Sequence, residues 1–229
     1  GKHLYSHTPY GRLGYGLIII YNIAEQTGEL TYAGKHVISG DLWISYEDNF
    51  DISLDGKYLY YAYTKSANII IESIARNSDT GLLTKVQTQT IGTVNNENNE
   101  SFGVNLIASN VGGKVFVAYQ GGVYSYTIDN DGQLIDGSFL VSYGEEYLYP
   151  ISMDITPNDS AIALFLRGGI NSDSYSQVTL LEKDSNSGDY ERVHTISPRT
   201  EIASSILFSP NNDLLQWFGT FDDQLYSME

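Results

Sequence analysis

Short stretches of alternating apolar and polar residues recur along the chain, and each is bounded by turn residues such as Asp, Asn and Gly. The clearest example is DISLDGKYLYYAY at residues 51–63, where two such stretches flank Asp55-Gly56. A period of two residues is typical of β-strands, and Asp-Gly predicts a two-residue hairpin turn because both residues tolerate positive φ angles. No stretch longer than about two turns has the 3.6-residue period of an amphipathic helix. The pattern predicts an all-β protein.

Two turn motifs repeat along the chain with nearly the same spacing. The first begins at residues 1, 56, 113, 159 and 212, at intervals of 55, 57, 46 and 53 residues. The second is a turn centred on Gly28, Gly81, Gly132 and Gly188, at intervals of 53, 51 and 56 residues. A shared period of about 50 residues is typical of propellers and solenoids.

Within one period the pattern predicts four short strands. In the second, third and fourth units these are residues 50–54, 58–63, 68–74 and 83–90; 104–108, 115–119, 123–128 and 135–141; and 151–155, 161–166, 177–181 and 192–196. Four antiparallel strands per repeat make one blade of a β-propeller. We therefore expect a single propeller domain with about five blades, in units of approximately 1–39, 40–91, 92–142, 143–197 and 198–229.

The first and last units are expected to be incomplete. The chain begins at the second strand of one blade, and residues 224–227 are typical of the third strand of another. The expected strand numbers are three, four, four, four and three. Two interpretations remain open: the units are part of a larger ring, or the two incomplete blades close a ring by pairing in one shared sheet. Unpaired edge strands promote aggregation, so we expect closure, a partner or self-assembly through these edges.

Composition narrows the functional classes. With 12 Lys and Arg against 28 Asp and Glu, the formal charge is −16, which disfavours binding to nucleic acid or to anionic membranes. There is no cysteine, and no apolar stretch is long enough to span a bilayer, so we expect no membrane insertion. Abundant Tyr and Gly with few charged residues favour an extracellular or cell-surface protein.

Particular segments resemble a known family. SLDGKYLYYAY with NIIIESIARNSDTGLLTKVQT, and LIIIYNIAEQTGELTYAG in the first unit, are similar to the repeat of the lactonase-type propellers, the YVTN and 6-phosphogluconolactonase-like group. That group forms seven-bladed rings, so the resemblance implies an apparently truncated ring or one with fewer blades. Blades of this type occur in hydrolases and in binding scaffolds, so the motif predicts fold more specifically than function.

Propellers bind ligands where the loops from the fourth strand to the next blade, and from the second strand to the third, surround the central channel. Here those loops are long, acidic and rich in tyrosine, which suits a protein or carbohydrate partner. The predicted ligand-binding residues are Trp43, Tyr46, Glu47, Asp48, Glu145, Glu146, Tyr147, Tyr149, Arg167 and Arg199. Our main hypothesis is a non-catalytic binding or scaffold domain that presents this surface.

The alternative hypothesis is a lactonase-like hydrolase. Pro198-Arg199 resembles the Pro-Arg-His segment of the phosphogluconolactonase-like enzymes, although Thr200 occupies the histidine position. This reading places Arg199, Glu201 and His7 near the channel.

We expect no cofactor and no metal site. The four histidines lack the spacing of metal ligands. IDNDGQLID, with Asp129, Asp131 and Asp136, resembles a calcium loop but has no glutamate at the twelfth position, so a hairpin turn is the better interpretation.

Overall fold

The structure is a computed structural model. It describes residues 1–10, 15–39, 42–43, 49–65, 68–93, 103–119, 122–142, 148–168, 175–197, 203–211, 215–219 and 224–228. These residues form 19 strands in five antiparallel sheets, and they include no helix of the kind that crosses a membrane.

The five sheets follow the order of the sequence, and we number them blades 1 to 5. Blade 1 contains β1 (His3–Tyr10), β2 (Tyr15–Ile23) and β3 (Leu30–Ser39). Blade 2 contains β4 (Leu42–Trp43), β5 (Phe50–Ile52), β6 (Tyr58–Lys65), β7 (Asn68–Arg76) and β8 (Leu83–Thr93). Blade 3 contains β9 (Asn105–Ala108), β10 (Lys114–Tyr119), β11 (Gly122–Ile128) and β12 (Leu134–Ser142). Blade 4 contains β13 (Tyr149–Ile155), β14 (Ala161–Gly168), β15 (Tyr175–Lys183) and β16 (Tyr190–Ile196), and blade 5 contains β17 (Ala203–Phe208), β18 (Leu215–Gly219) and β19 (Gln224–Met228).

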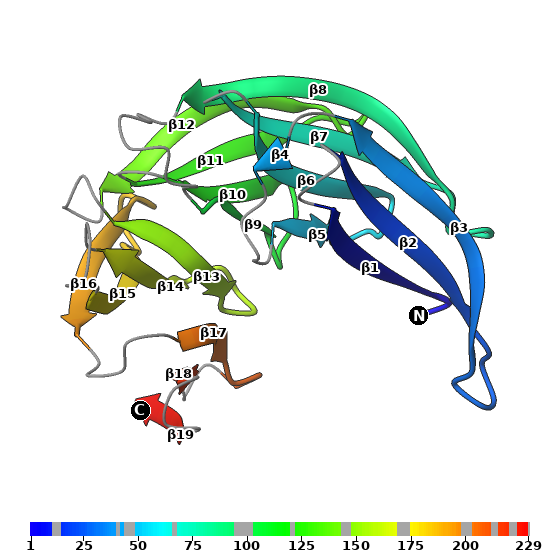
Figure 1. Cartoon of the computed structure of the whole chain (residues 1–229). Helices are drawn as coiled ribbons and strands as arrows, with labels where there is room; N and C mark the ends of the chain where they lie inside the picture. The colour runs from blue at the N-terminus through cyan, green and yellow to red at the C-terminus, as the bar shows by residue number, and fades with distance from the viewer. Residues whose placement is uncertain are drawn as a thin grey trace.

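The blades are arranged side by side around an open arc (Figure 1). The strands β5, β9, β13 and β17 lie on the inside of the arc, whereas β3, β8, β12 and β16 lie on the outside. This arrangement confirms the predicted all-β propeller.

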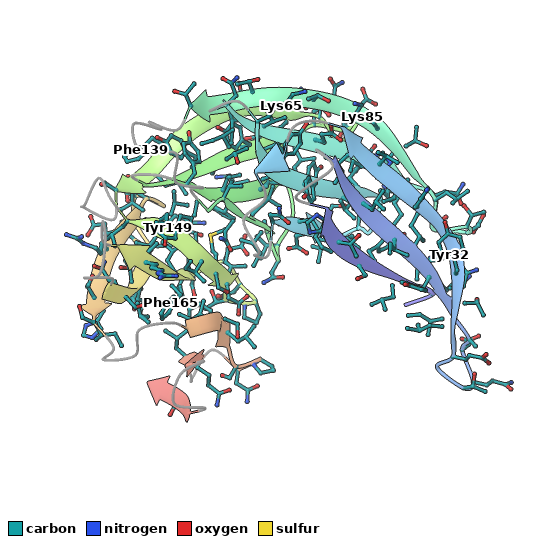
Figure 2. The ribbon with its side chains drawn as sticks, in the orientation of Figure 1. Tyr32, Lys65, Lys85, Phe139, Tyr149 and Phe165 are labelled. Atoms are coloured by element: carbon teal, nitrogen blue, oxygen red, sulfur yellow. The ribbon has the colours of Figure 1, made fainter. Side chains whose placement is uncertain are left out.

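Blades 2, 3 and 4 bury apolar side chains on both of their faces. In β14, Ile162 and Leu164 pack in a cluster with Phe116 of blade 3. The alternate residues of the same strand, Ala163 and Phe165, pack in a cluster with Ile206 of blade 5; Figure 2 labels Phe165. Because successive side chains of a strand point to opposite faces, a strand covered on both sides is apolar throughout. This explains the continuous apolar run AIALFL at residues 161–166.

The first turn motif joins the inner strand of a blade to its second strand. In blade 2, the Ser53 amide donates to the Tyr58 carbonyl oxygen at 2.8 Å, and the Gly56 amide donates to the Ser53 carbonyl oxygen at 2.8 Å. The prediction of a two-residue turn with two positive φ angles is wrong, because Gly56 has a φ of 69° whereas Asp55 is not among the positive-φ residues. The loop is longer, and the Asp55 side chain shapes it by accepting hydrogen bonds from the Ser53 hydroxyl and the Lys57 amide.

The second turn motif is confirmed in four blades. Its glycines have φ angles of 71°, 72°, 77° and 78°, and each glycine amide donates to the carbonyl oxygen of the residue at the start of the turn. In this left-handed region a side chain is costly, which explains why glycine recurs at this position. These glycines are Gly28, Gly81, Gly132 and Gly188.

Two strand predictions need correction. Blade 2 contains five strands because β4 and β5 both pair with β6. The two incomplete sheets do not share strands: within the described residues β1–β3 and β17–β19 are separate sheets, and Figure 1 shows them apart. Closure by one shared sheet is therefore wrong. Apolar side chains remain exposed on these end blades, with Leu4 at 42%, Val37 at 51% and Leu207 at 58% exposed.

Carboxylates on the inner strands link neighbouring blades. Asp51 Oδ2 of β5 accepts a hydrogen bond from the Ala108 amide of blade 3 at 2.9 Å, and Asp154 Oδ2 of β13 accepts one from the Phe208 amide of blade 5 at 2.7 Å. Blade 3 has Ile107 at the equivalent position. There the link is made by Asn110, whose side chain donates to two carbonyl oxygens of blade 4 at 3.2 Å.

We predict that Asp154→Ala lowers the free energy of unfolding by about 1–3 kcal/mol, because the Phe208 amide loses its acceptor at a partly buried position. Urea unfolding measures this change. Asp189→Ala, in an exposed turn of the same blade, is the matched control and should change stability by less than about 0.5 kcal/mol. Equal stability of Asp154→Ala and the wild-type protein would contradict the proposed link.

Candidate functional site

The blades have two faces, one at each end of their strands. The two turn motifs lie at one of these faces, which we call the turn face. At the opposite face, which we call the loop face, the inner strand of each blade begins and the second strand ends. The loop face is the predicted ligand-binding end.

The described site residues come from this loop face. Tyr149, at the start of β13, and Arg167, near the end of β14, are cross-strand partners, so they lie side by side at the loop face of blade 4. Both are partly buried, and Figure 2 labels Tyr149. Trp43 pairs with Thr64 near the end of β6, at the loop face of blade 2. The other predicted ligand-binding residues, Tyr46, Glu47, Asp48, Glu145, Glu146, Tyr147 and Arg199, lie outside the described residues, so the predicted set remains a prediction.

Polar residues on the inner strands lie just inside this end and were missed in the sequence. Asn49, Asn105 and Ser152 each stand four residues before the Ser or Thr whose backbone amide closes the first turn of its blade, and all three are buried. Asn105 Nδ2 donates to the Pro150 carbonyl oxygen at 3.2 Å, and the Ser152 hydroxyl accepts from the Ile206 amide at 3.2 Å. The turn register could have located them. Asn105 and Ser152 thus join neighbouring blades beneath the loop face.

His7 lies in the contact between blades 1 and 2. Its Nε2 is 2.8 Å from the Tyr61 hydroxyl, and its ring also contacts Phe50 edge-on. Burial lowers the pKa of His7 to about 4, so the imidazole is neutral at pH 7 and is a weak proton acceptor. The structure therefore places His7 among packed aromatic residues. Arg199 and Glu201, its partners in the hydrolase hypothesis, lie outside the described residues.

A buried carboxylate on the same contact was also missed. Glu72 of β7 is 1% exposed and accepts a hydrogen bond from the Tyr63 hydroxyl at 3.2 Å. Lys85 Nζ lies 3.6 Å from Glu72 Oε1, and His36 Nε2 of blade 1 lies 3.9 Å from Oε2. Burial raises the pKa of Tyr63, and the charge of Glu72 adds to this effect. A single Glu inside the apolar run NIIIESIA is the only sequence signal for this cluster, which joins two blades.

The Asp129 segment forms a hairpin turn, as interpreted from the sequence. Asp129 Oδ1 accepts hydrogen bonds from the amides of Asp131 and Gln133 at 2.9 and 2.8 Å. In the described part of the chain, no three His, Asp or Glu side chains are grouped as metal ligands.

The fold and the repeated turns define this chain as a β-propeller. A family comparison matches residues 1–96, which cover blade 1 and all the strands of blade 2, to the family described as "Lactonase, 7-bladed beta-propeller". This match confirms the resemblance to lactonase-type propellers.

Solved structures show the same fold. A protein from Lactobacillus plantarum superposes with a TM-score of 0.71 at 14% identity, and the match covers 100% of this chain and 67% of that one. The periplasmic gluconolactonase PpgL of Pseudomonas aeruginosa gives a TM-score of 0.67 at 16% identity, with 100% and 67% covered. A putative 6-phosphogluconolactonase from Bacteroides fragilis gives 0.58 at 14% identity, with 97% and 68% covered. This chain thus spans about two thirds of the length of each. Comparison of the sequence with curated proteins gives no match.

We predict that the protein loses stability as the pH falls, and that protonation of His7 causes part of this loss. The folded-state pKa of about 4 lies below the ordinary histidine value of 6.5, so the unfolded chain binds the proton more readily between these values. The contribution of neutral His7 is therefore complete above pH 6.5 and is lost as the pH falls toward 4.

Urea unfolding near pH 7 and near pH 4.5 measures this effect, with His7→Gln as the comparison, because glutamine keeps a hydrogen-bonding group beside Tyr61 but does not titrate. The wild-type protein should lose more stability than the variant on acidification. An equal loss in both proteins would show that His7 does not contribute.

Proposed function

We propose that this chain provides the propeller scaffold of a gluconolactonase-type hydrolase, which opens the ring of a sugar lactone. The observation that carries the proposal is the match of residues 1–96 to the lactonase family. Neighbours described as a gluconolactonase and as a putative 6-phosphogluconolactonase support it. These findings favour the hydrolase hypothesis over our main hypothesis from the sequence, a non-catalytic binding or scaffold domain.

The loop face of blade 4 supplies a suitable binding group for such a reaction. When water attacks the lactone carbonyl, the carbonyl oxygen becomes negatively charged, and the carbon-to-ring-oxygen bond then breaks. The proton lost by the attacking water passes to the ring oxygen, and the product is a hydroxy acid. A guanidinium is always protonated and donates paired hydrogen bonds, so Arg167 is proposed to bind this developing oxyanion.

Tyr149 is proposed to border the substrate, because it is the cross-strand partner of Arg167. Its ring offers an apolar surface for a sugar, and its hydroxyl can exchange hydrogen bonds with sugar hydroxyls. The general base is proposed to be Glu145, Glu146 or Glu201, three carboxylates that the sequence predicts at the ligand-binding end or near the channel. His7 is a poor candidate because its pKa is about 4 and its Nε2 faces the Tyr61 hydroxyl.

The test measures hydrolysis of glucono-δ-lactone and of 6-phosphogluconolactone by the acid that each releases, above the spontaneous rate. We expect the wild-type chain to accelerate the reaction and Arg167→Ala to lower kcat/KM by about 10²–10³-fold, because it removes an oxyanion donor. Arg192→Ala, on the exposed outer strand β16, is the matched control and should keep full activity. No acceleration by the wild-type chain would contradict the hydrolase proposal and favour a binding role.

A further inference from the structure

A groove of about 310 Å³ opens on the turn face, between blades 2 and 3. Three turns form its walls: residues 53–58 of blade 2, residues 108–114 of blade 3, and residues 128–130, also of blade 3. It is therefore at the opposite end of the blades from Tyr149 and Arg167.

The junction of blades 2 and 3 lacks a polar bridge that the next junction has. At the junction of blades 3 and 4, Asn110 follows the Ser109 that closes the turn, and its side chain donates to the carbonyl oxygens of Ile155 and Thr156 at 3.2 Å. At the junction of blades 2 and 3 the equivalent residue is Leu54. A leucine side chain cannot make these hydrogen bonds, and Leu54 is 63% exposed at the edge of the groove. The junction of blades 2 and 3 therefore lacks the bridge that Asn110 makes between blades 3 and 4.

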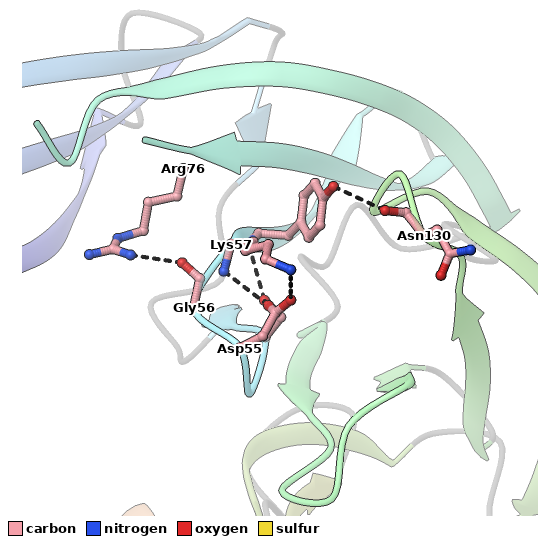
Figure 3. A network of polar contacts seen from close by, with 7 residues as sticks. Asp55, Gly56, Lys57, Arg76 and Asn130 are labelled. Carbon is pink, nitrogen blue, oxygen red and sulfur yellow. Dashed lines mark hydrogen bonds and ion pairs between the residues drawn. The ribbon is translucent and has the colours of Figure 1, made fainter. Parts of the chain in front are cut away.

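The turn at residues 53–58 is held rigidly from outside the groove. Arg76 Nη1 donates to the Gly56 carbonyl oxygen at 2.8 Å, and Arg76 Nε donates to the Tyr5 hydroxyl at 2.8 Å. The Tyr5 hydroxyl in turn donates to the Gly81 carbonyl oxygen at 2.8 Å. Figure 3 shows Arg76 bound to Gly56 on one side and the Asp55–Lys57 ion pair on the other.

The blade 3 walls are fixed as well. The Ser109 hydroxyl and the Asn110 amide both donate to the carboxylate of Asp159 in blade 4. The Tyr58 hydroxyl donates to the Asn130 carbonyl oxygen at 3.4 Å, and a Cβ on Gly132 would lie 2.2 Å from the Tyr58 ring, so this ring is packed tightly against the turn. A groove with fixed walls loses little entropy when a ligand binds.

The polar groups of the groove are balanced in charge. Lys57 and Asp55 form an ion pair at 3.1 Å, and Lys114 and Asp129 also line the groove. Asp129 Oδ1 accepts the two hydrogen bonds of its own turn. Among the described residues, Asp129 Oδ2 has no hydrogen-bond or ion-pair partner. Two ammonium groups and two carboxylates give no net formal charge, so neither a strongly anionic nor a strongly cationic ligand gains from this groove.

Apolar surface lies beside these charges, from the Tyr58 ring, Ile128 and Ala108. A sugar ring has hydroxyl groups that both donate and accept hydrogen bonds, and its C–H faces pack on aromatic rings. The groove volume is at the small end of ligand sites, which span about 300–1,000 Å³.

We propose that the groove between blades 2 and 3 is a binding site for a neutral sugar of one or two rings. Lys114 and Asn130 donate to its hydroxyls, Asp129 accepts from them, and Tyr58 contacts the ring. This site is independent of the proposed hydrolase site on the loop face, because the two lie at opposite ends of the strands.

The experiment titrates the complete chain, labelled with ¹⁵N, with D-glucose, N-acetylglucosamine and maltose, and follows the backbone amide signals by NMR. We expect saturable shifts at Lys114, Asn130 and Gly113 for at least one of these sugars, without saturable shifts at Arg167. Lys114→Ala and Asn130→Ala should each weaken binding by about tenfold, the effect of about 1.4 kcal/mol. Asn186→Ala, in the equivalent exposed turn of blade 4, is the matched control and should bind as the wild type does.

Leu54→Asn is a second test that leaves every proposed contact group in place. An asparagine here can repeat the bridge that Asn110 makes and narrow the groove, so sugar binding should fall while the protein remains folded. The absence of saturable shifts for all three sugars would overturn the proposal, as would binding that Leu54→Asn and Lys114→Ala leave unchanged. Loss of lactonase activity in Arg167→Ala with sugar binding intact would show that the two sites are separate.

Discussion

Every sheet of this chain depends on a neighbouring sheet to cover it. Residues such as Leu164 and Phe165 are successive in one strand, yet they pack against different blades, so neither face of blade 4 is stable without its neighbours. The apolar clusters each combine residues of two adjacent blades. Hydrophobic burial of about 25 cal/mol per Å² makes this lateral packing the main source of stability. The turns and the inner-strand hydrogen bonds then fix the register in which the sheets meet.

Polar links between blades are more specific than the apolar packing, and they differ from one junction to the next. Asp51 and Asp154 make the same contact two blades apart, whereas the intervening junction relies on Asn110 and Asp159. The junction of blades 1 and 2 instead buries Glu72 and His7. Similar sheets are therefore joined by different chemistry, which leaves room for distinct surfaces at each junction.

The fold could be predicted from the sequence because its strongest signals are local. Glycine at the left-handed turn position, as at Gly81, and alternating strands on either side are properties of short segments. The exception is instructive: Asp159 has a φ of 54° where blade 2 has Gly56, and its carboxylate binds Ser109 and Asn110 of the neighbouring blade. A tertiary contact there compensates for a backbone conformation that a side chain disfavours.

The candidate site could be predicted less completely, because it depends on residues far apart in the sequence. The sequence predicts Tyr149 and Arg167 as loop-face residues, and only the strand register shows that they are neighbours. The contact of His7 with Tyr61 spans 54 residues, and the cluster around Glu72 joins two blades. Leu54 lines the turn-face groove where the next junction has the bridging Asn110, a difference that is recognised only when the turns are superposed.

The open arrangement of the arc has a consequence for how the protein loses structure. Blades 1 and 5 share no sheet within the described residues, so the blades form a linear series in which each is stabilised by its nearest neighbours. Such a series frays from its two ends, and its interior persists longest. Among the described residues, blade 3 therefore has a neighbour on each side, whereas blades 1 and 5 have one each, an asymmetry that a closed ring with no ends would not have.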